Sequence, residues 1–328
     1  MAYYSTSGTA NNTADLLVKL KDFLVTMCGW TLHDDGSGLA DPYYVLKSSG
    51  ESGMEDIYIQ FINDSSSDCI SVKGYLYWNA DTHAGIKVVF SSGATVISTK
   101  DSAQFLYWLY GDLDHVFVVT KITATYYGHY SGIIKRYWSG AVAITQAAVT
   151  AGSNVVIQIN DASLLTVGSY YIIKDDANIE RVQVTARDTE STPNTITIAT
   201  LVAGYASGAK VGEDPQPVII GRNNMPGSLY ALNKWNGYTS ATGQTGSCGA
   251  ANATYAGYAD PDVRYGLTIM FPWLVAMTST GNEEVRGELI DVYSIGSGAG
   301  DSEDVLDLGT GTYKMFNLSN GGWCAIKE

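Results

Sequence analysis

The sequence predicts an α+β protein that is predominantly β, with an N-terminal helix packed on an antiparallel sheet and a small all-β barrel or sandwich inserted into it. Three observations predict this class. One segment near the start has helical periodicity, many short runs rich in Val, Ile and Tyr follow it, and the composition changes between residues 139 and 216. With 328 residues, 45% of them hydrophobic, the chain can bury the cores of two or three domains.

The helix is predicted from an apolar stripe that follows a capping residue. Asn12 or Thr13 supplies the cap and Gly29 the stop. The stripe is made of large apolar side chains at helical spacing, namely Leu16, Leu17, Leu20, Phe23, Leu24 and Met27. Such a stripe has to pack on another element, and the sheet that follows is the expected partner.

The sheet is predicted from five short runs separated by Gly, Asp and Ser clusters, which is typical of an antiparallel meander. The runs are WTLHD, PYYVLKS, DIYIQFI, CISVKGYLYW and IKVVFS. A second, short helix is predicted over residues 101–110, with Thr99 or Asp101 as its cap. A hairpin follows, made of HVFVVTKITATYY and HYSGIIKRYW, and Gly128 is expected among its turn residues.

The domain boundaries are predicted from the change in composition. Aromatic residues become rare after about residue 139, and SNVVIQIN, SYYIIKD, ERVQVTARD and NTITIAT are expected strands. Two prolines near residue 216 precede a segment whose composition is again rich in aromatic residues and glycine. We therefore expect a discontinuous main α+β domain of residues 1–138 and 217–328, an inserted small β domain of residues 139–216, and an extended loop region at residues 223–260.

Charge and hydropathy argue against two classes of function, nucleic-acid binding and membrane spanning. The formal net charge is −14, with only 19 Lys and Arg residues and no basic run, so direct sequence-specific contact with nucleic acid is not expected. No apolar run approaches the roughly 20 residues of a membrane-spanning helix, and the stretch MAYYSTSGTANN lacks the basic start and the apolar run of a secretory signal. We expect a protein without a membrane span.

Searches for catalytic, cofactor and metal motifs find none, so an enzyme is not predicted. Asp112, Asp114 and His115 form the best local grouping for a metal, but a turn explains them better, as it does the adjacent His33 and Asp34. The carboxylates of an acidic loop around residues 301–307 could bind Ca²⁺. The favoured interpretation is that this loop is solvated and binds no metal. The four cysteines favour free thiols and leave disulfides open.

Tyrosine is unusually frequent, with 23 copies. Tyr suits surfaces that become interfaces, although strands also use it on half-buried pleats. The aromatic residues that we expect at an interface lie in the inserted domain and in the extended loop region, and they are Tyr170, Tyr171, Trp235, Tyr238, Tyr255 and Tyr258.

Several runs together resemble structural proteins of tailed-phage virions. They are GW at residues 29–30, YVLKSSGESGMEDIYIQF, YWLYGDLDHVFVVTKI, YYGHYSGIIKRY, EVRGELIDVYSI and YKMFNLSNGGWCAIK, while DASLLTVGSYYIIKDDANIERVQVTA is similar to small β modules inserted in such proteins. The resemblance implies a non-enzymatic virion protein, assembled in the host cytoplasm, whose partners are copies of itself in a ring and neighbouring virion proteins. Neck, tail and baseplate positions all fit.

Two other functions stay open. A carbohydrate- or receptor-binding adhesin module of a phage tail would use aromatic side chains such as Tyr75, Tyr77, Trp78, Trp235 and Tyr238 to stack on sugar rings. A hydrolase would need a pair of carboxylates that only the fold brings together.

Overall fold

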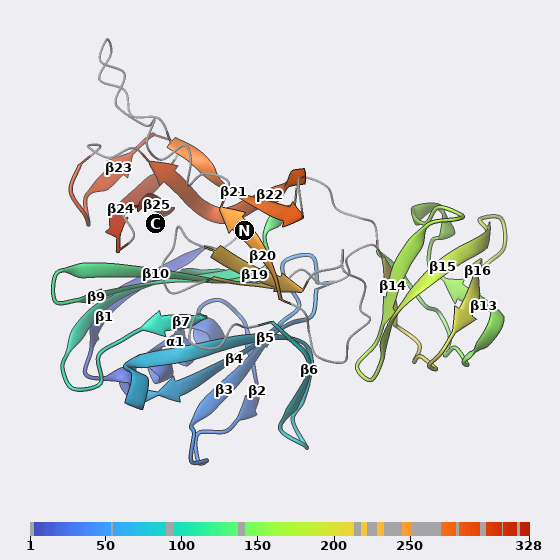
Figure 1. The fold of residues 1–328 in the computed structure, drawn as a ribbon, viewed down its shortest axis with the longest axis horizontal. Helices are drawn as coiled ribbons and strands as arrows, with labels where there is room; N and C mark the ends of the chain where they lie inside the picture. Colours follow the sequence, from blue (N-terminus) through green and yellow to red (C-terminus); the bar gives the residue numbers. More distant parts are fainter. Residues whose placement is uncertain are drawn as a thin grey trace, which may run out of the picture. The chain divides into compact units, whose positions relative to one another are not determined.

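The computed structural model shows a predominantly β protein with an N-terminal helix and antiparallel sheets (Figure 1). It describes residues 3–53, 55–89, 95–136, 142–212, 218–221, 228–232, 245–250, 270–279, 282–295, 300–309, 311–319 and 322–328. The chain divides into two compact units. Unit 1 comprises Met1–Tyr137, Val218–Leu232 and Thr245–Glu328, and unit 2 comprises Trp138–Pro217 and Asn233–Gln244.

Unit 1 begins with a strand, a helix and a small antiparallel sheet. The small sheet has the order β2-β3-β4-β5-β6, and β7 also pairs with β5. Its elements and the helix are α1 (Thr13–Thr26), β2 (Thr31–Asp35), β3 (Tyr43–Ser48), β4 (Ile57–Asp64), η1 (Ser65–Ser67), β5 (Cys69–Asn79), β6 (Ala84–Val89) and β7 (Val96–Ser98).

A second, larger sheet completes unit 1. Its described strands run in the order β1-β8-β9-β10-β18-β19-β20-β21-β22-β25-β24-β23, with β11 beside β22 and one bridge between β10 and β24. They are β1 (Tyr4–Ala10), β8 (Phe105–Gly111), β9 (His115–Ile122), β10 (Thr125–Gly132), β11 (Lys135–Arg136), β18 (Ile219–Gly221), β19 (Ser228–Leu232), β20 (Thr245–Ala250), β21 (Met270–Ser279), β22 (Asn282–Ile295), β23 (Val305–Asp307), β24 (Thr312–Leu318) and β25 (Gly322–Lys327).

Unit 2 is a six-stranded antiparallel sheet with the order β12-β17-β14-β15-β16-β13. A bridge between Thr145 and Ile159 joins its two end strands, so the sheet closes around an apolar core that includes Ile173, Val184 and Ile196. Its elements are β12 (Val142–Ile144), β13 (Gly152–Ile159), η2 (Ala162–Leu164), β14 (Tyr170–Lys174), β15 (Ile179–Asp188), β16 (Asn194–Leu201) and β17 (Lys210–Gly212).

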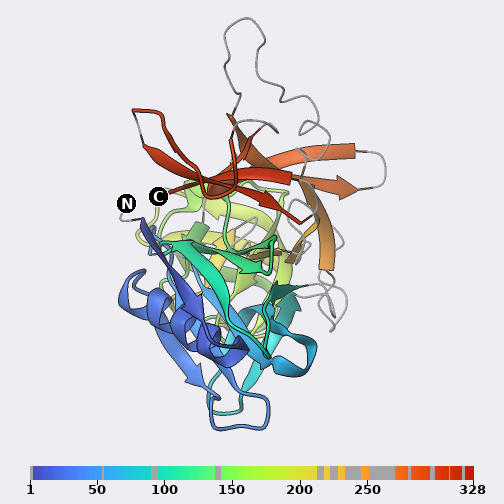
Figure 2. The same cartoon turned by 90° about the vertical axis from the view of Figure 1, so that its left-hand side faces the viewer.

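The predicted N-terminal helix is confirmed. Asn12 caps α1 by accepting a hydrogen bond from the backbone N–H of Asp15 at 2.9 Å, and Gly29 follows the helix with φ = +78°. The buried stripe is the predicted one, except that Met27 is 39% exposed. The helix packs beside β1 and β8 and on β2–β5 (Figures 1 and 2). This apolar contact, rather than helix propensity, accounts for most of its stability.

Three local predictions were wrong. Residues 101–110 contain no helix, because most of the segment belongs to β8. Gly128 lies inside β10, where a Cβ would come within 2.7 Å of Leu318, and the turn of the hairpin lies at residues 123–124. The predicted loop region 223–260 is wrong at β19 and β20, and its residues 223–227, 233–244 and 251–260 lie outside the described part.

The turn between β8 and β9 joins the two sheets of unit 1. The indole N–H of Trp30 donates to the carbonyl of Asp112 at 2.7 Å, and the Ser48 hydroxyl donates to the carbonyl of Leu113 at 2.5 Å. The Asp112 carboxylate accepts from the backbone N–H groups of Asp114 and His115, at 2.7 and 3.0 Å, and lies 2.9 Å from His115 Nδ1. Both partners of this pair are buried, so they hold the turn in one geometry.

We predict that Asp112→Asn lowers the free energy of unfolding by about 3 kcal/mol, because it replaces a buried carboxylate that accepts two backbone N–H bonds and lies 2.9 Å from His115 Nδ1. Burial raises the pKa of Asp112, but the hydrogen bonds and charge of His115 and its neighbours outweigh burial and hold the pKa below its ordinary value. The stabilisation that the ionised Asp112 carboxylate contributes to the folded state is therefore complete above the ordinary pKa of an aspartate, and it is lost as pH falls below that value. Urea unfolding at neutral pH measures the loss. The exposed Asp101→Asn is the control, and equal midpoints for the two variants would contradict the prediction.

His129 gives a second, separate pH dependence. Burial lowers its pKa to about 3 from an ordinary value of 6.5, and its ring bonds the carbonyl of Val96 and the hydroxyl of Ser131. Between these two values the unfolded chain binds a proton that the folded chain does not, so stability falls as pH decreases through this window. We expect His129→Gln to flatten the fall in urea midpoint between about pH 7 and pH 4.5. An unchanged slope would assign the acid sensitivity to other groups.

Candidate functional site

The predicted interface residues are described only in part. Tyr170 on β14 is 51% exposed, and the Arg181 guanidinium lies 4.0 Å from its ring centre. Tyr171 is buried in the core of unit 2, and its hydroxyl accepts a hydrogen bond from the backbone N–H of Thr166 at 2.7 Å. Its side chain therefore supports the fold and does not anchor a surface contact. The other four, Trp235, Tyr238, Tyr255 and Tyr258, lie outside the described residues.

Strand β1 forms one edge of the large sheet. It pairs with β8 from Tyr4↔Gly111 to Ala10↔Phe105 and with no other described strand. Its sequence YSTSGTA contains no charged residue and no proline, and its alternate residues Ser5, Ser7 and Thr9 are exposed. An edge of this kind presents backbone N–H and C=O groups to another strand. A Lys19 ammonium donates to the carbonyl of Thr9 at 2.8 Å, at the end of the strand next to α1.

The small sheet has an inner and an outer face. The inner face carries Leu46, Ile59 and Val72, all fully buried, and a Cβ at Gly74 would contact Val218 and Ile220 at the start of β18. We call the opposite side the outer face. It carries an aromatic cluster that consists of Tyr43, Val45, Tyr58, Tyr75 and Trp78.

Asp34 is the polar centre of the outer face. Its Oδ2 accepts hydrogen bonds from the Trp78 indole at 2.7 Å and the Tyr43 hydroxyl at 3.1 Å, and it lies 2.9 Å from His83 Nδ1. Burial raises the pKa of Asp34, but these three bonds outweigh burial and lower it below its ordinary value. The carboxylate is therefore ionised near neutral pH and fixes the Tyr43 and Trp78 rings.

A β-bulge explains how Asp34 reaches this position. The register between β2 and β3 shifts between Leu32 and Asp34, so His33 and Asp34 both lie on the outer face. His33 Nε2 lies 2.9 Å from the carbonyl of Trp78 and does not bond Asp34. Sequence adjacency suggested His33 as the acid–base partner of Asp34, whereas the structure supplies His83, from the loop before β6.

Two glycines let the tyrosine rings lie flat on the outer face. A Cβ at Gly36 would approach the Tyr43 ring to 2.3 Å, and one at Gly85 would approach the Tyr75 ring to 2.1 Å. The Tyr75 hydroxyl donates to Gln60 Oε1 at 3.0 Å, which orients the buried amide of Gln60. The rings are thus packed on backbone and hydrogen-bonded at their hydroxyl ends, and they are not exposed stacking surfaces.

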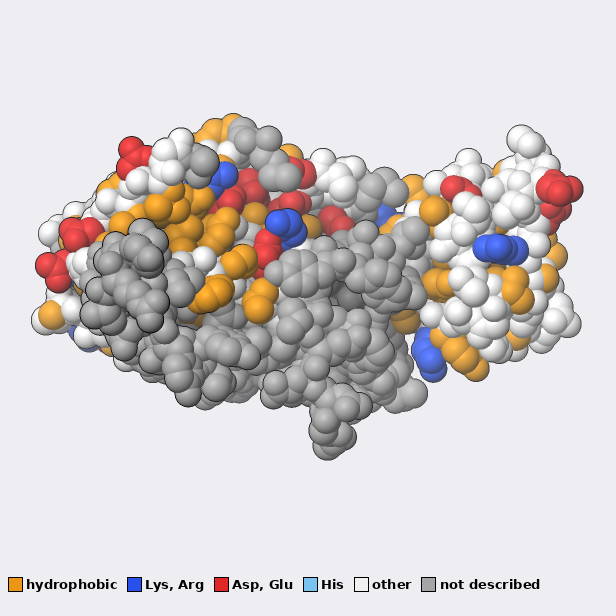
Figure 3. Space-filling model, turned by 90° about the horizontal axis from the view of Figure 1, so that it is seen from above, with side chains coloured by type: hydrophobic (Ala, Val, Ile, Leu, Met, Phe, Trp, Pro, Cys, Tyr) orange, Lys and Arg blue, Asp and Glu red, His pale blue; other side chains and the backbone are white. Residues whose placement is uncertain are grey.

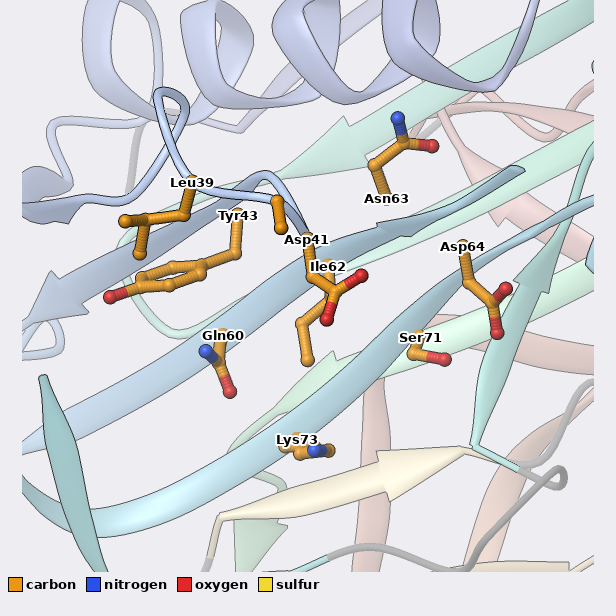
Figure 4. A pocket seen from close by; sticks show the side chains of 10 residues that line it. Leu39, Asp41, Tyr43, Gln60, Ile62, Asn63, Asp64, Ser71 and Lys73 are labelled. Atoms are coloured by element: carbon orange, nitrogen blue, oxygen red, sulfur yellow. The ribbon is translucent and has the colours of Figure 1, made fainter. Parts of the chain in front are cut away.

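A pocket of about 710 Å³ opens beside this cluster (Figure 4). One wall is the loop residues Leu39, Ala40 and Asp41. The rest of the lining comes from three neighbouring strands, with Tyr43 on β3, then Gln60, Ile62, Asn63 and Asp64 on β4, and finally Ser71 and Lys73 on β5. The register places Tyr43 opposite Ile62 and Gln60 opposite Lys73, so an apolar pair lies next to a polar pair.

The pocket combines hydrogen-bonding groups with apolar surface and lies next to a histidine–carboxylate pair. The described residues hold no group of three His, Cys, Asp or Glu side chains arranged for a metal. In the acidic loop, which was considered as a Ca²⁺ site, the Glu303 carboxylate accepts hydrogen bonds from Lys121 and Tyr126.

The described cysteines Cys28, Cys69 and Cys324 are free thiols. No described helix is long and apolar enough to cross a bilayer.

Sequence reasoning did not find the pocket. The only local signal is Gln60, a polar residue within the otherwise apolar run IYIQFI. No protein-family model matches the chain, and a search of the curated proteins found no match.

We predict that Gly36→Ala lowers the free energy of unfolding by about 1–3 kcal/mol, because the new methyl group must displace the Tyr43 ring. The control is Gly38→Ala in the same loop, where a Cβ has no neighbour within 4 Å and the expected change is within about 0.5 kcal/mol. Urea unfolding compares the two. Equal effects would mean that loop flexibility, and not contact with Tyr43, determines the result.

Proposed function

We propose that this chain is a non-enzymatic structural protein of a tailed-phage virion that assembles with copies of itself through the edge strand β1. The observation that carries the proposal is the uncharged edge of the large sheet, on which Ser5, Ser7 and Thr9 are exposed. Adding a strand to such an edge supplies main-chain hydrogen bonds without requiring an apolar patch. The resemblance of several sequence runs to virion proteins supports the same function.

The proposed assembly is a closed ring in a neck, tail or baseplate. A ring needs a heterologous contact, in which β1 of one copy pairs with a different edge of the next copy. The inserted small β domain and the residues of the 223–260 region would contact neighbouring virion proteins, with Tyr170 as an exposed aromatic anchor. The net charge of −14 suits a surface that does not grip DNA, and Lys and Arg side chains lie apart on the face shown in Figure 3.

A second candidate is a carbohydrate- or receptor-binding adhesin module of a phage tail. The pocket on the outer face favours it. Of the five aromatic residues first expected to stack on sugars, Tyr75 and Trp78 are buried and do not carry this alternative. Tyr77 is half-buried, and Trp235 and Tyr238 lie outside the described residues.

The test of the assembly is the solution mass of the chain, measured by light scattering after size exclusion. We expect a closed oligomer of more than two copies. The double variant Ser5→Glu and Ser7→Glu should shift it towards monomer, because charged residues on an edge strand oppose strand addition. The control is Ser65→Glu and Ser67→Glu, which adds the same charge at exposed positions of η1 in the same unit.

Three results would contradict the proposal. A monomeric parent chain would remove self-assembly. A dimer would indicate that β1 pairs with β1, which forms a two-fold contact and not a ring. An edge variant with the same mass as the parent would show that the contact lies elsewhere.

A further inference from the structure

We infer that the pocket between the 39–41 loop and strands β3–β5 is a binding site for a neutral saccharide. This inference deepens the second candidate function by assigning its site and ligand class. It is independent of the assembly proposal, because β1 contributes no residue to the pocket.

The size and shape of the pocket fit a small ligand. Its volume of about 710 Å³ lies within the range of small-molecule sites, and Figure 4 shows the side chains that line it. The floor is rigid, since it is formed by three hydrogen-bonded strands. A site built on strands keeps its geometry when empty, which reduces the entropy lost on binding.

The lining matches the two kinds of surface that a sugar ring presents. Ile62 is half-buried and Leu39 is 50% exposed, so C–H groups find aliphatic contacts. Hydroxyl groups find Gln60, whose Oε1 is already held by the Tyr75 hydroxyl, so the amide is oriented before a ligand arrives. Ser71 adds a hydroxyl on the neighbouring strand.

The charges at the pocket favour a neutral ligand. Asp41 and Asp64 contribute two carboxylates and Lys73 one ammonium group. A carboxylate accepts hydrogen bonds from hydroxyl groups, and charged partners make the stronger bonds. An anion such as a phosphate ester would meet a net negative rim on a chain of net charge −14, so its binding is disfavoured.

The test uses saturation-transfer NMR and calorimetry with glucose, galactose, N-acetylglucosamine, lactose and chitobiose as probes. We expect at least one of them to bind with a dissociation constant below about 10 mM. Ser71→Phe fills the floor of the pocket and should abolish that binding. Asp41→Asn removes one charged acceptor and should weaken binding about tenfold.

The matched control is Asp81→Asn, an equal change at an exposed position in the β5–β6 loop outside the pocket, which should bind as the parent does. Unchanged urea midpoints would establish that each variant is folded. The inference is overturned if none of the five probes binds, or if the Ser71 and Asp41 variants bind as tightly as the parent. A loss of binding with an unchanged oligomer mass separates this result from the assembly test.

Discussion

The buried pair of Asp112 and His115 is the interaction on which the arrangement of unit 1 depends. It shapes a turn whose carbonyl groups accept hydrogen bonds from Trp30, after the helix, and from Ser48, at the end of β3. The backbone N–H of Glu51 donates to the Asp114 carboxylate at 2.8 Å, which adds a third connection from the small sheet. One tight turn therefore holds the small sheet, the end of the helix and the large sheet together.

The connection that the β8–β9 turn makes between the two sheets determines which surfaces of unit 1 remain open to solvent. Because the inner face of the small sheet is covered by α1 and the start of β18, polar groups such as Gln60 and Lys73 are placed on the outer face. The Asp34 network then fixes the aromatic side chains there, and the pocket opens beside rings that do not move freely. At the large sheet, α1 lies next to β1 on one side of the strand and leaves its outer edge unpaired with any described strand.

The features that sequence could predict are the local ones. The α1 stripe, its Asn12 cap and the β2–β6 meander depend on neighbours along the chain, and they were found. Strand β8 was read as a helix because both of its faces are buried, Trp108 and Tyr110 on one and Leu109 on the other, so alternation is lost. His83 and Asp34 lie 49 residues apart and meet only through a bulge, which leaves no local pattern to detect.

Charge decides what kind of contact copies of this chain can make. A net charge of −14 on each copy produces repulsion that opposes association at long range. At physiological ionic strength this repulsion is screened beyond about 8 Å, whereas backbone hydrogen bonds between strands act only at contact. An uncharged edge such as β1 adds no local repulsion of its own, because its exposed side chains are hydroxyls. The proposed self-association through this edge should therefore strengthen as salt rises, in contrast to an interface built on ion pairs, which salt weakens.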